Sequence, residues 1–578
     1  MSRLGTTTER RHQRGALTII TPMLLLVVII LSVMALDGAR LYSLRGEMQA
    51  QVNVAAQAGA SATQSCGGLA PSTALIRQRA LVAAQAQGFS GDAEALTIRT
   101  GVIEADENTN VLAFRAVNFI EESNAVLVSY TRNEPVSLLL PESIFGTLDI
   151  TVNAAARKEV VATLSAAGST ASVDAGIVGG LLGSVLGDPT YVLDPTSLDS
   201  LRNTTVKLGD LLTEVGVADV ADLLDLDGQV LASALRDIGG ISTPVGQTLD
   251  DLLGAAGLDT VQVSEVLEVV EGTQVPASSE FPLYDMLISL VLNVAETQQD
   301  ALGGFLSVPL DVDLDLGAVA NVDASVRLNV GEAPRIVIGP ARQDADGNWV
   351  TRFYAPDIRL QVLADVQLLS LGGLLSGANV SLPLAVNVGG AEGEFVSARC
   401  AVGTANQVAI GVNINRSVAR LGTGTIDTDS GDIIPENGDL DLVGLLGLHV
   451  LSADVFIDGE VPGVQESNVI ISDDYPLYCS ESGCSEDSYQ DTGDGVGGLD
   501  LDLDLQNVTL LGLQLQLTPV LNLLEGLLSD VVEALAGSLI NPLLESLGIG
   551  LGGVTVTVSN ADQGGSQLIE NVPVVAAN

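Results

Sequence analysis

A single uncharged run near the N-terminus constrains this chain more than any other feature. From Ala16 to Leu36 the sequence contains no charged residue and no Asn or Gln. At about 1.5 Å per residue, roughly 20 apolar residues in a helix span the ~30 Å hydrocarbon core of a bilayer. A secretory signal has only about 7–15 residues in its apolar region. The run therefore predicts a transmembrane helix over 16–36.

The segment before this run is basic, with four arginines and one acid: Arg3, Arg10, Arg11, Arg14 and Glu9. Loops rich in Lys and Arg stay on the cytoplasmic side of a membrane. We therefore expect residues 1–15 to form a cytoplasmic tail and everything after Asp37 to be exported.

A cleaved signal peptide is the alternative interpretation. Val33 and Ala35 stand at the third and first positions before a possible cleavage point, where small residues are preferred. However, no proline occurs between Pro22 and Pro71. A helical stripe also continues past the run, with apolar or small residues at spacings of three and four: Leu41, Leu44, Met48, Val52, Ala55 and Gly59. This pattern favours an anchor that continues as a helical stalk over 37–65.

The run is preceded by Arg-Gly and followed by "ALDGARLYSLRGEMQAQVNVAAQAGA". This segment, 13–60, resembles the N-terminal segment of the TadG-like proteins of the tight-adherence (Tad/Flp) pilus-assembly system. Those proteins have Asp-x-x-Arg-x-Tyr after the span, then a Leu/Gln stretch and small residues ending in Ala-Gly-Ala. The matching positions here are Gly15, Asp37, Arg40, Tyr42, Leu44, Gln49, Ala55, Ala56, Gly59 and Ala60.

The resemblance implies a bacterial inner-membrane protein with a periplasmic body and other Tad/Flp pilus-assembly proteins as partners. Self-association through the N-terminal helix is a further expectation. Pilins of such systems are similar in this segment but carry Glu at the fifth position after the cleaved glycine. Counted from Gly15, that position is Ile20. The missing Glu argues against polymerisation of this chain into the filament.

The composition describes a folding chain that does not bind nucleic acid. Its 578 residues suffice for several domains, and 47% are hydrophobic against 17% charged. The formal net charge of −48 would repel phosphate backbones and anionic headgroups. Such a surface favours solubility, and cation collection is the functional alternative.

Four cysteines lie beyond the predicted anchor, at Cys66, Cys400, Cys479 and Cys484. An even number in an oxidising compartment predicts disulfides. The spacing in "CSESGC" makes Cys479–Cys484 the simplest local pair, which leaves Cys66 with Cys400. A metal site is the competing interpretation, but histidines are lacking nearby and C-x4-C is a weak zinc spacing.

The rest of the chain reads as a series of α+β regions. We expect a small α/β module over 66–160 and a Gly/Ser/Ala-rich linker or packed loop over 161–194. Leucines at helical spacing predict a helical region over 195–305. Within it, "VKLGDLLTEV" aligns weakly with "VQVSEVLEVV". Two packed helix pairs would explain this repeat, and chance similarity is the alternative.

Beyond residue 305 the apolar period changes to two. Alternating Leu and Asp predicts a β-rich domain over 306–470, with an apolar face on the core and an acidic face in water. We expect residues 471–498 to form an exposed acidic loop that is constrained by its cysteines. Residues 499–578 predict a strand, an amphipathic helix and a second strand. Acidic residues interrupt that helix too often for a second membrane span.

No catalytic or cofactor motif stands out. The histidines are His12 and His449, so Ser-His-Asp and Cys-His sets are lacking. "DADGN" (344–348) and "DTDSGD" (427–432) lack the spacing of calcium loops and read better as Asx-rich turns. The D-x-S-x-S metal site of many TadG-like proteins is also lacking, since "DASVR" at Asp323 departs at its last position.

These observations predict a non-enzymatic, single-pass inner-membrane protein without a cofactor, which acts in the assembly or anchoring of a Tad/Flp-type pilus. The alternative is a membrane-tethered periplasmic protein that binds an apolar ligand such as a lipid between its Leu-rich strands and its helix. An enzyme is a third, disfavoured class.

Overall fold

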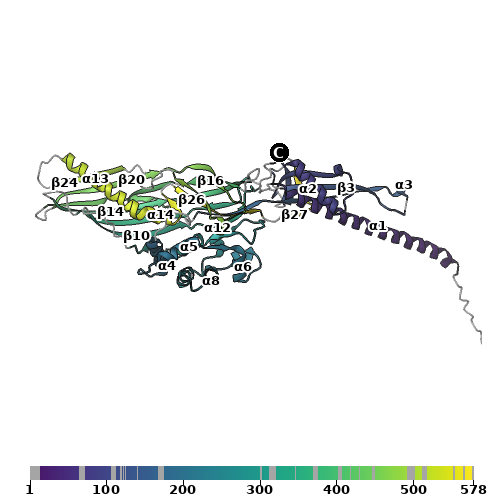
Figure 1. Cartoon of the computed structure of the whole chain (residues 1–578), viewed down its shortest axis with the longest axis horizontal. Helices are drawn as coiled ribbons and strands as arrows, with labels where there is room; N and C mark the ends of the chain where they lie inside the picture. Colours follow the sequence, from purple (N-terminus) through teal and green to yellow (C-terminus); the bar gives the residue numbers. More distant parts are fainter. Residues whose placement is uncertain are drawn as a thin grey trace, which may run out of the picture. The chain divides into compact units, whose positions relative to one another are not determined.

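The computed structural model divides the chain into two compact units (Figure 1). Unit 1 comprises 1–65, 71–158 and 566–578, and unit 2 comprises 66–70 and 159–565. The structure describes residues 14–63, 72–105, 112–117, 120, 123, 125–139, 141–166, 175–299, 302–310, 320–344, 347–368, 375–400, 407–416, 418–428, 430–444, 449–490, 502–510, 517–550, 553–563 and 566–575.

Unit 1 is a sheet with helices packed against it. Its strand order is β27-β4-β3-β1-β2-β28, and all described pairings are antiparallel except β2 with β28. The elements are α1 (Arg14–Ala60), α2 (Thr73–Ala86), η1 (Ala93–Ala95), β1 (Leu96–Ala105), β2 (Leu112–Ala116), β3 (Ala125–Pro135), α3 (Glu142–Phe145), β4 (Thr147–Arg157), β27 (Gln567–Glu570) and β28 (Val574–Val575).

The second half of α1 lies where a helical stalk was expected over 37–65, and it belongs to the core of unit 1. Met48, Val52, Ala55 and Ala56 are buried and pack with residues of α2, β3 and β4. The predicted apolar stripe therefore lies along one side of α1, and that side faces the sheet. A stripe of apolar residues on a helix is stable only when another element covers it.

The module expected over 66–160 is formed by segments from other parts of the chain as well. Residues at the far C-terminus add β27 and β28 to its two edges, although they are more than 400 residues away in sequence. Conversely, β5 (Val160–Ser165) belongs to unit 2, where every one of its residues is buried.

The largest sheet of unit 2 has nine described strands, all paired antiparallel. The strands β17 and β19 lie end to end, because both pair with β14 and with β20. The predicted alternation holds: Leu440 and Leu442 are buried while Asp439 is exposed. The strands are β9 (Leu306–Val308), β10 (Ala320–Glu332), β13 (Asp357–Leu368), β14 (Leu375–Val388), β17 (Ala419–Ile426), β18 (Ile433–Pro435), β19 (Gly438–Gly444), β20 (His449–Val461) and β24 (Asp502–Leu510).

Two further large sheets and one strand pair complete the β structure of unit 2. The seven-stranded sheet contains β5, β7 (Leu267–Val269), β11 (Ile336–Pro340), β22 (Leu477–Tyr478), β23 (Ser485–Gln490), β25 (Ile549–Gly550) and β26 (Gly553–Gln563). The four-stranded sheet contains β12 (Arg352–Tyr354), β15 (Ala391–Cys400), β16 (Val408–Arg416) and β21 (Gln465–Ser472), and the pair is β6 (Thr205–Lys207) with β8 (Glu280–Pro282).

Two expected irregular segments are regular in part. The linker expected over 161–194 contains most of β5 and the helix α4 (Ala175–Leu186), which is apolar on all sides and buried. A helix without an amphipathic period suits a position inside a core. The loop expected over 471–498 contains β22, α12 (Cys479–Ser482) and β23, and β23 pairs antiparallel with β26.

The region expected to be helical over 195–305 contains seven described helices and the short strands β6, β7 and β8. The two aligned segments within it do not form two similar helix pairs. "VKLGDLLTEV" forms β6 followed by α6, whereas "VQVSEVLEVV" forms a helix followed by β7. β6 pairs antiparallel with β8, and β7 pairs parallel with β11. The helices are α5 (Pro195–Asn203), α6 (Leu208–Val215), α7 (Val220–Leu224), α8 (Gly228–Gly239), α9 (Pro244–Leu252), α10 (Val263–Val266) and α11 (Leu283–Gln299).

The C-terminal helix is continuous but changes its winding. It comprises α13 (Leu517–Leu535), a π-helical turn η6 (Ala536–Ile540) and α14 (Asn541–Ser546). The wider turn ends two residues before Pro542, whose nitrogen has no hydrogen to donate. Four residues of the predicted stripe are buried: Leu528, Val531, Leu535 and Leu539.

Candidate functional site: the N-terminal helix and its sheet

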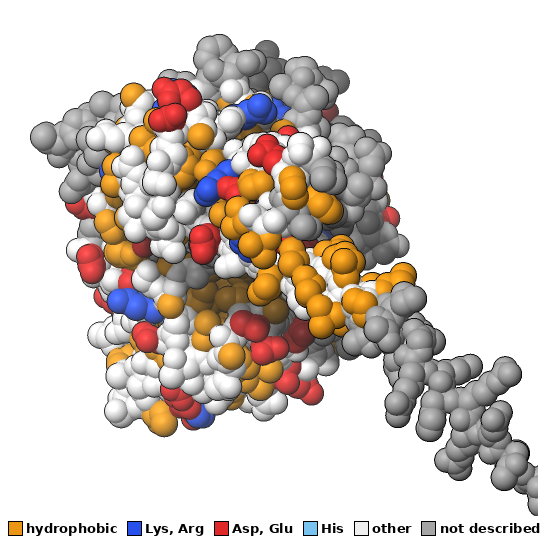
Figure 2. Space-filling model, turned by 90° about the vertical axis from the view of Figure 1, so that its right-hand side faces the viewer, with side chains coloured by type: hydrophobic (Ala, Val, Ile, Leu, Met, Phe, Trp, Pro, Cys, Tyr) orange, Lys and Arg blue, Asp and Glu red, His pale blue; other side chains and the backbone are white. Residues whose placement is uncertain are grey.

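The first half of α1 is an apolar helix that no other described part of the protein covers. Apart from the half-buried Val33, its large side chains between Met23 and Leu36 are exposed, from 43% at Ile30 to 70% at Met23. Figure 2 looks at the molecule from the N-terminal side of α1 and shows a dense apolar surface there. Among the described residues, this is the one helix long and apolar enough to cross a membrane. Soluble proteins do not leave a surface of this kind uncovered.

An ion pair holds the helix to the sheet just beyond the apolar run. Arg40 Nη1 donates to Glu134 Oε2 at 3.1 Å, and Arg40 Nη2 donates to the carbonyl of Pro135. Glu134 is buried and also meets Arg132 at 2.6 Å. The buried carboxylate is therefore compensated by two guanidinium groups, as a buried charge requires.

Two other polar residues of the predicted motif also contact this hairpin of β3 and β4. Asp37 accepts a hydrogen bond from the backbone nitrogen of Leu138 at 3.4 Å. Gln49 donates to the carbonyl of Asn153 at 3.0 Å and to the Asn53 side chain at 2.9 Å. These polar contacts therefore fix how far α1 is shifted along its own axis relative to the hairpin of β3 and β4.

The small motif residues allow the helix and the sheet to approach closely. Ala55, Ala56 and Ala60 are fully buried. At Gly59, an added Cβ would lie 3.1 Å from Cγ1 of Val126 in β3. The motif positions Asp37, Arg40, Gln49, Ala55, Ala56, Gly59 and Ala60 are therefore brought together along one contact with the hairpin and α2.

Two motif positions lie apart from this contact. Tyr42 is 83% exposed on α1, so its ring is available to a lipid or a protein. Gly15 is the second residue of α1. The structure therefore separates the matching positions into a packing set and one outward-facing aromatic residue.

The partners on the hairpin could not be identified from the sequence. Glu134, Pro135 and Leu138 lie in a strand-like stretch with no feature that pairs them with a helix about a hundred residues earlier. The one available signal is a Glu inside a strand pattern, since a carboxylate in a buried strand requires a cation.

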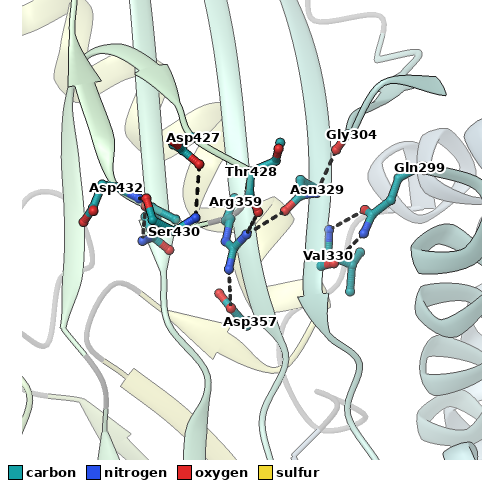
Figure 3. A network of polar contacts seen from close by, with 12 residues as sticks. Gln299, Gly304, Asn329, Val330, Asp357, Arg359, Asp427, Thr428, Ser430 and Asp432 are labelled. Atoms are coloured by element: carbon teal, nitrogen blue, oxygen red, sulfur yellow. Dashed lines mark hydrogen bonds and ion pairs between the residues drawn. The ribbon is translucent and has the colours of Figure 1, made fainter. Parts of the chain in front are cut away.

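The side chains of the candidate turns of unit 2 accept hydrogen bonds from backbone nitrogens. In Figure 3, Asp427 Oδ1 accepts from the Ser430 nitrogen at 3.1 Å, and Ser430 Oγ accepts from the Asp432 nitrogen at 3.2 Å. Likewise, Asp344 Oδ1 accepts from the Asn348 nitrogen at 2.9 Å. Both are the Asx-type turns predicted from the sequence.

An arginine network beside the first of these turns ties loops to the nine-stranded sheet (Figure 3). Arg359 donates to the carbonyl of Thr428 at 2.6 Å, to Asn329 at 3.3 Å and to Asp357 at 3.1 Å. Burial raises the pKa of Asp357, and the Arg359 cation partly offsets that effect. These contacts suit a structural role, because they join backbone to side chains of neighbouring strands.

No metal-ligating cluster is found in the described part of the chain. No group of three or more His, Cys, Asp or Glu side chains there is placed to hold a metal ion. His449 is the first residue of β20, and its side chain lies outside the described residues. A hollow of about 610 Å³ on the nine-stranded sheet is lined mainly by polar residues, among them Asp323, Asp365 and Asp439.

One of the predicted disulfides is present. Cys479 and Cys484 are bonded, with Cα atoms 4.4 Å apart, around the short helix α12. The predicted Cys66–Cys400 pair lies outside the described residues, because Cys66 and the side chain of Cys400 are not among them.

Comparisons with protein-family models, curated proteins and solved structures find no match to this chain. The resemblance of 13–60 to TadG-like proteins therefore stays a prediction. What the structure itself gives is one long apolar N-terminal helix joined to a β-rich body with some helices.

Proposed function

We propose that this chain is a non-enzymatic, single-pass protein of the bacterial inner membrane that acts in the assembly or anchoring of a Tad/Flp-type pilus. The apolar half of α1 is the anchor and the N-terminus is cytoplasmic. Unit 2 and the part of unit 1 beyond Leu36 are periplasmic. The resemblance at Gly15–Ala60 supplies the pilus system as the context.

One observation carries this proposal: the uncovered apolar helix and the helix packed into unit 1 are the same helix. α1 runs without a break from Arg14 to Ala60. Its contacts begin at Asp37, one residue after the apolar run ends. Force on unit 1 would therefore reach the membrane through continuous backbone hydrogen bonds rather than through a loop.

The same continuity supports an anchor over a cleaved signal. The possible cleavage point after Ala35 lies inside this helix, two residues before Asp37. Cleavage there would remove the apolar half and leave a packed helix with no tether. The contacts of Arg40 and Gln49 would then hold the shortened helix against the β3–β4 hairpin but would not connect the protein to a membrane.

The disulfide supports export of the body. The Cys479–Cys484 bond lies in unit 2, and disulfides persist in the periplasm but are rare in the cytosol. Peptide mapping of the unreduced protein from cells should recover the two cysteines linked. Recovery of free thiols at both positions would contradict a periplasmic body.

The topology is tested by extraction and by reporter fusions to the full chain. Alkaline phosphatase fused after Asn578 should be active, and the protein should resist alkaline carbonate extraction. N-terminal sequencing should find no species that begins at Leu36. A soluble species beginning there, or an inactive periplasmic reporter, would overturn the proposed anchoring.

The pilus role is tested in a bacterium that carries this chain together with a Tad/Flp system. Deletion of its gene should reduce surface pili in electron micrographs, and the full chain should restore them. A body whose residues 1–36 are replaced by a cleavable signal should fail to restore them. Unchanged piliation after deletion would refute the pilus role but not the anchoring.

The alternative is an apolar-ligand carrier. Two hollows of the described residues, one beside Arg342 and one beside Asp365, are lined mainly by charged and polar side chains, which does not favour an apolar ligand there. Native mass spectrometry that found a co-purified lipid would favour the carrier.

A further inference from the structure

We propose that the tip of the β3–β4 hairpin is a second membrane contact, which rests in the headgroup region of the bilayer that α1 spans. The tip comprises residues 136–139 and 141–146, which include α3. This inference rests on the proposed anchoring by α1. It adds a lipid-binding site in unit 1 that is separate in sequence from the transmembrane segment.

The tip exposes large apolar side chains. Leu138 is 66% exposed, Leu139 70%, Phe145 47% and Leu148, at the start of β4, 49%. These side chains are not part of the core of unit 1. The hairpin contributes other residues to that core, such as Val128 and Val152. Large apolar side chains exposed together in one short segment indicate an interaction surface.

The height of the tip relative to the membrane is fixed by hydrogen bonds. The backbone nitrogen of Leu138 donates to Asp37, and the carbonyl of Pro135 accepts from Arg40. Asp37 directly follows Leu36, the last residue of the apolar run. Figure 1 shows the hairpin extending from the sheet alongside α1, with α3 at its far end. The tip therefore lies level with the point where the proposed anchor enters the bilayer.

The polar residues near the tip set its depth. Glu142 of α3 is exposed, and a carboxylate is unfavourable in the hydrocarbon core. Tyr42, 83% exposed and five residues beyond Asp37 on α1, suits the headgroup level, where Tyr and Trp are enriched. The combination describes a shallow contact, with Leu138, Leu139 and Phe145 at the boundary of the acyl chains.

Two contacts would hold unit 1 differently from one. A single helix leaves a body free to tilt and to rotate about the helix axis. A second apolar contact, held beside the helix by Asp37 and Arg40, would restrict both motions. Unit 1 would then present a fixed side to the membrane and a fixed side to its partners.

The test places a fluorescent reporter at the tip of the full chain. The natural Trp349 is first replaced by Trp349→Phe, and Phe145→Trp is then introduced. The protein is reconstituted into vesicles of phosphatidylethanolamine and phosphatidylglycerol, with or without lipids that carry a quencher on the acyl chain. Two matched variants in the same background are Leu36→Trp, at the end of the anchor, and Val82→Trp, which is exposed on α2.

We expect quenching of the Phe145→Trp variant close to that of Leu36→Trp and several-fold above that of Val82→Trp. Adding Leu139→Glu should abolish the quenching at position 145 and leave that at position 36 unchanged. Quenching at position 36 but not at 145 would overturn the tip contact and leave the anchor intact. Blue-shifted emission at 145 without lipid quenching would assign the patch to a protein partner or a second copy instead. Absence of quenching at both positions would overturn the anchoring as well.

Discussion

The Arg40 guanidinium donates to the Glu134 carboxylate at 3.1 Å, across 94 residues of sequence. This pair joins the first turns of α1 beyond the apolar run to the end of β3. It explains why a charged residue can stand on the buried side of a helix, and it connects the proposed membrane anchor to the folded body at a defined height.

Arg40→Ala should destabilise unit 1. Glu134 would keep Arg132 as a partner but would lose one charge-assisted hydrogen bond, at a cost of about 1.5–3 kcal/mol. Chemical unfolding of the full chain in detergent, with hydrogen exchange followed over 125–157, measures this loss. Arg45→Ala is the control, because Arg45 is exposed on the same helix. Equal stability of the two variants would contradict a structural role for the pair.

Gly59→Leu should also destabilise the contact between α1 and the sheet. Its Cβ would lie 3.1 Å from Val126, and overpacking of this kind costs about 1–3 kcal/mol. At Gly46 an added Cβ meets nothing within 4 Å, so Gly46→Leu should raise helix stability by up to about 1 kcal/mol. Thermal melting of the two variants should therefore shift in opposite directions.

Arg359→Ala should weaken unit 2. The substitution removes the donor to the Thr428 carbonyl and leaves the partly buried Asp357 without its cation, at a cost of about 3 kcal/mol. The control is Arg420→Ala, whose partner Glu460 is half exposed, and which should change stability by less than about 1 kcal/mol. Urea unfolding curves compare the two, and a smaller effect at Arg359 would refute the assigned role of the network.

Tyr191→Phe should reduce the sensitivity of unit 2 to alkali. Burial and the nearby Asp251 carboxylate raise the pKa of Tyr191 from 10.0 to about 12. The unfolded chain therefore releases this proton first, and the stability contributed by Tyr191 is lost as the pH rises from about 10 to about 12. Unfolding followed between those pH values should show a shallower decline for Tyr191→Phe, and parallel curves would contradict this assignment.

The sequence predicted elements well where a local period decides them. The stripe from Leu41 to Gly59 predicted a helix, and "TPVLNLLEGLLSDVV" predicted α13. Apolar residues that alternate with polar ones predicted the strands β13 and β19. In each case one face repeats with the geometry of a helix or a strand. The predicted turn at Asp344 and the Cys479–Cys484 bond also depend on neighbours a few residues apart.

The sequence was less informative where the same pattern suits two environments. The helix expected as a stalk is packed against a sheet, and the segment expected as a Gly-rich linker contains the buried helix α4. An apolar stripe shows that a surface must be covered but not what covers it. The weak repeat failed because similar apolar spacing occurs in elements of different order, β6–α6 and α10–β7.

By itself, the sequence determined that this protein has an apolar N-terminal helix long enough for a bilayer and a β-rich acidic body. Length, charge and periodicity are local properties, and they fix which elements form. Only the tertiary structure decided that Arg40 meets Glu134, that the C-terminal strands β27 and β28 complete unit 1, and that the hairpin tip lies beside Asp37. Those pairings depend on the free energy of whole surfaces brought together across hundreds of residues, which no local pattern encodes.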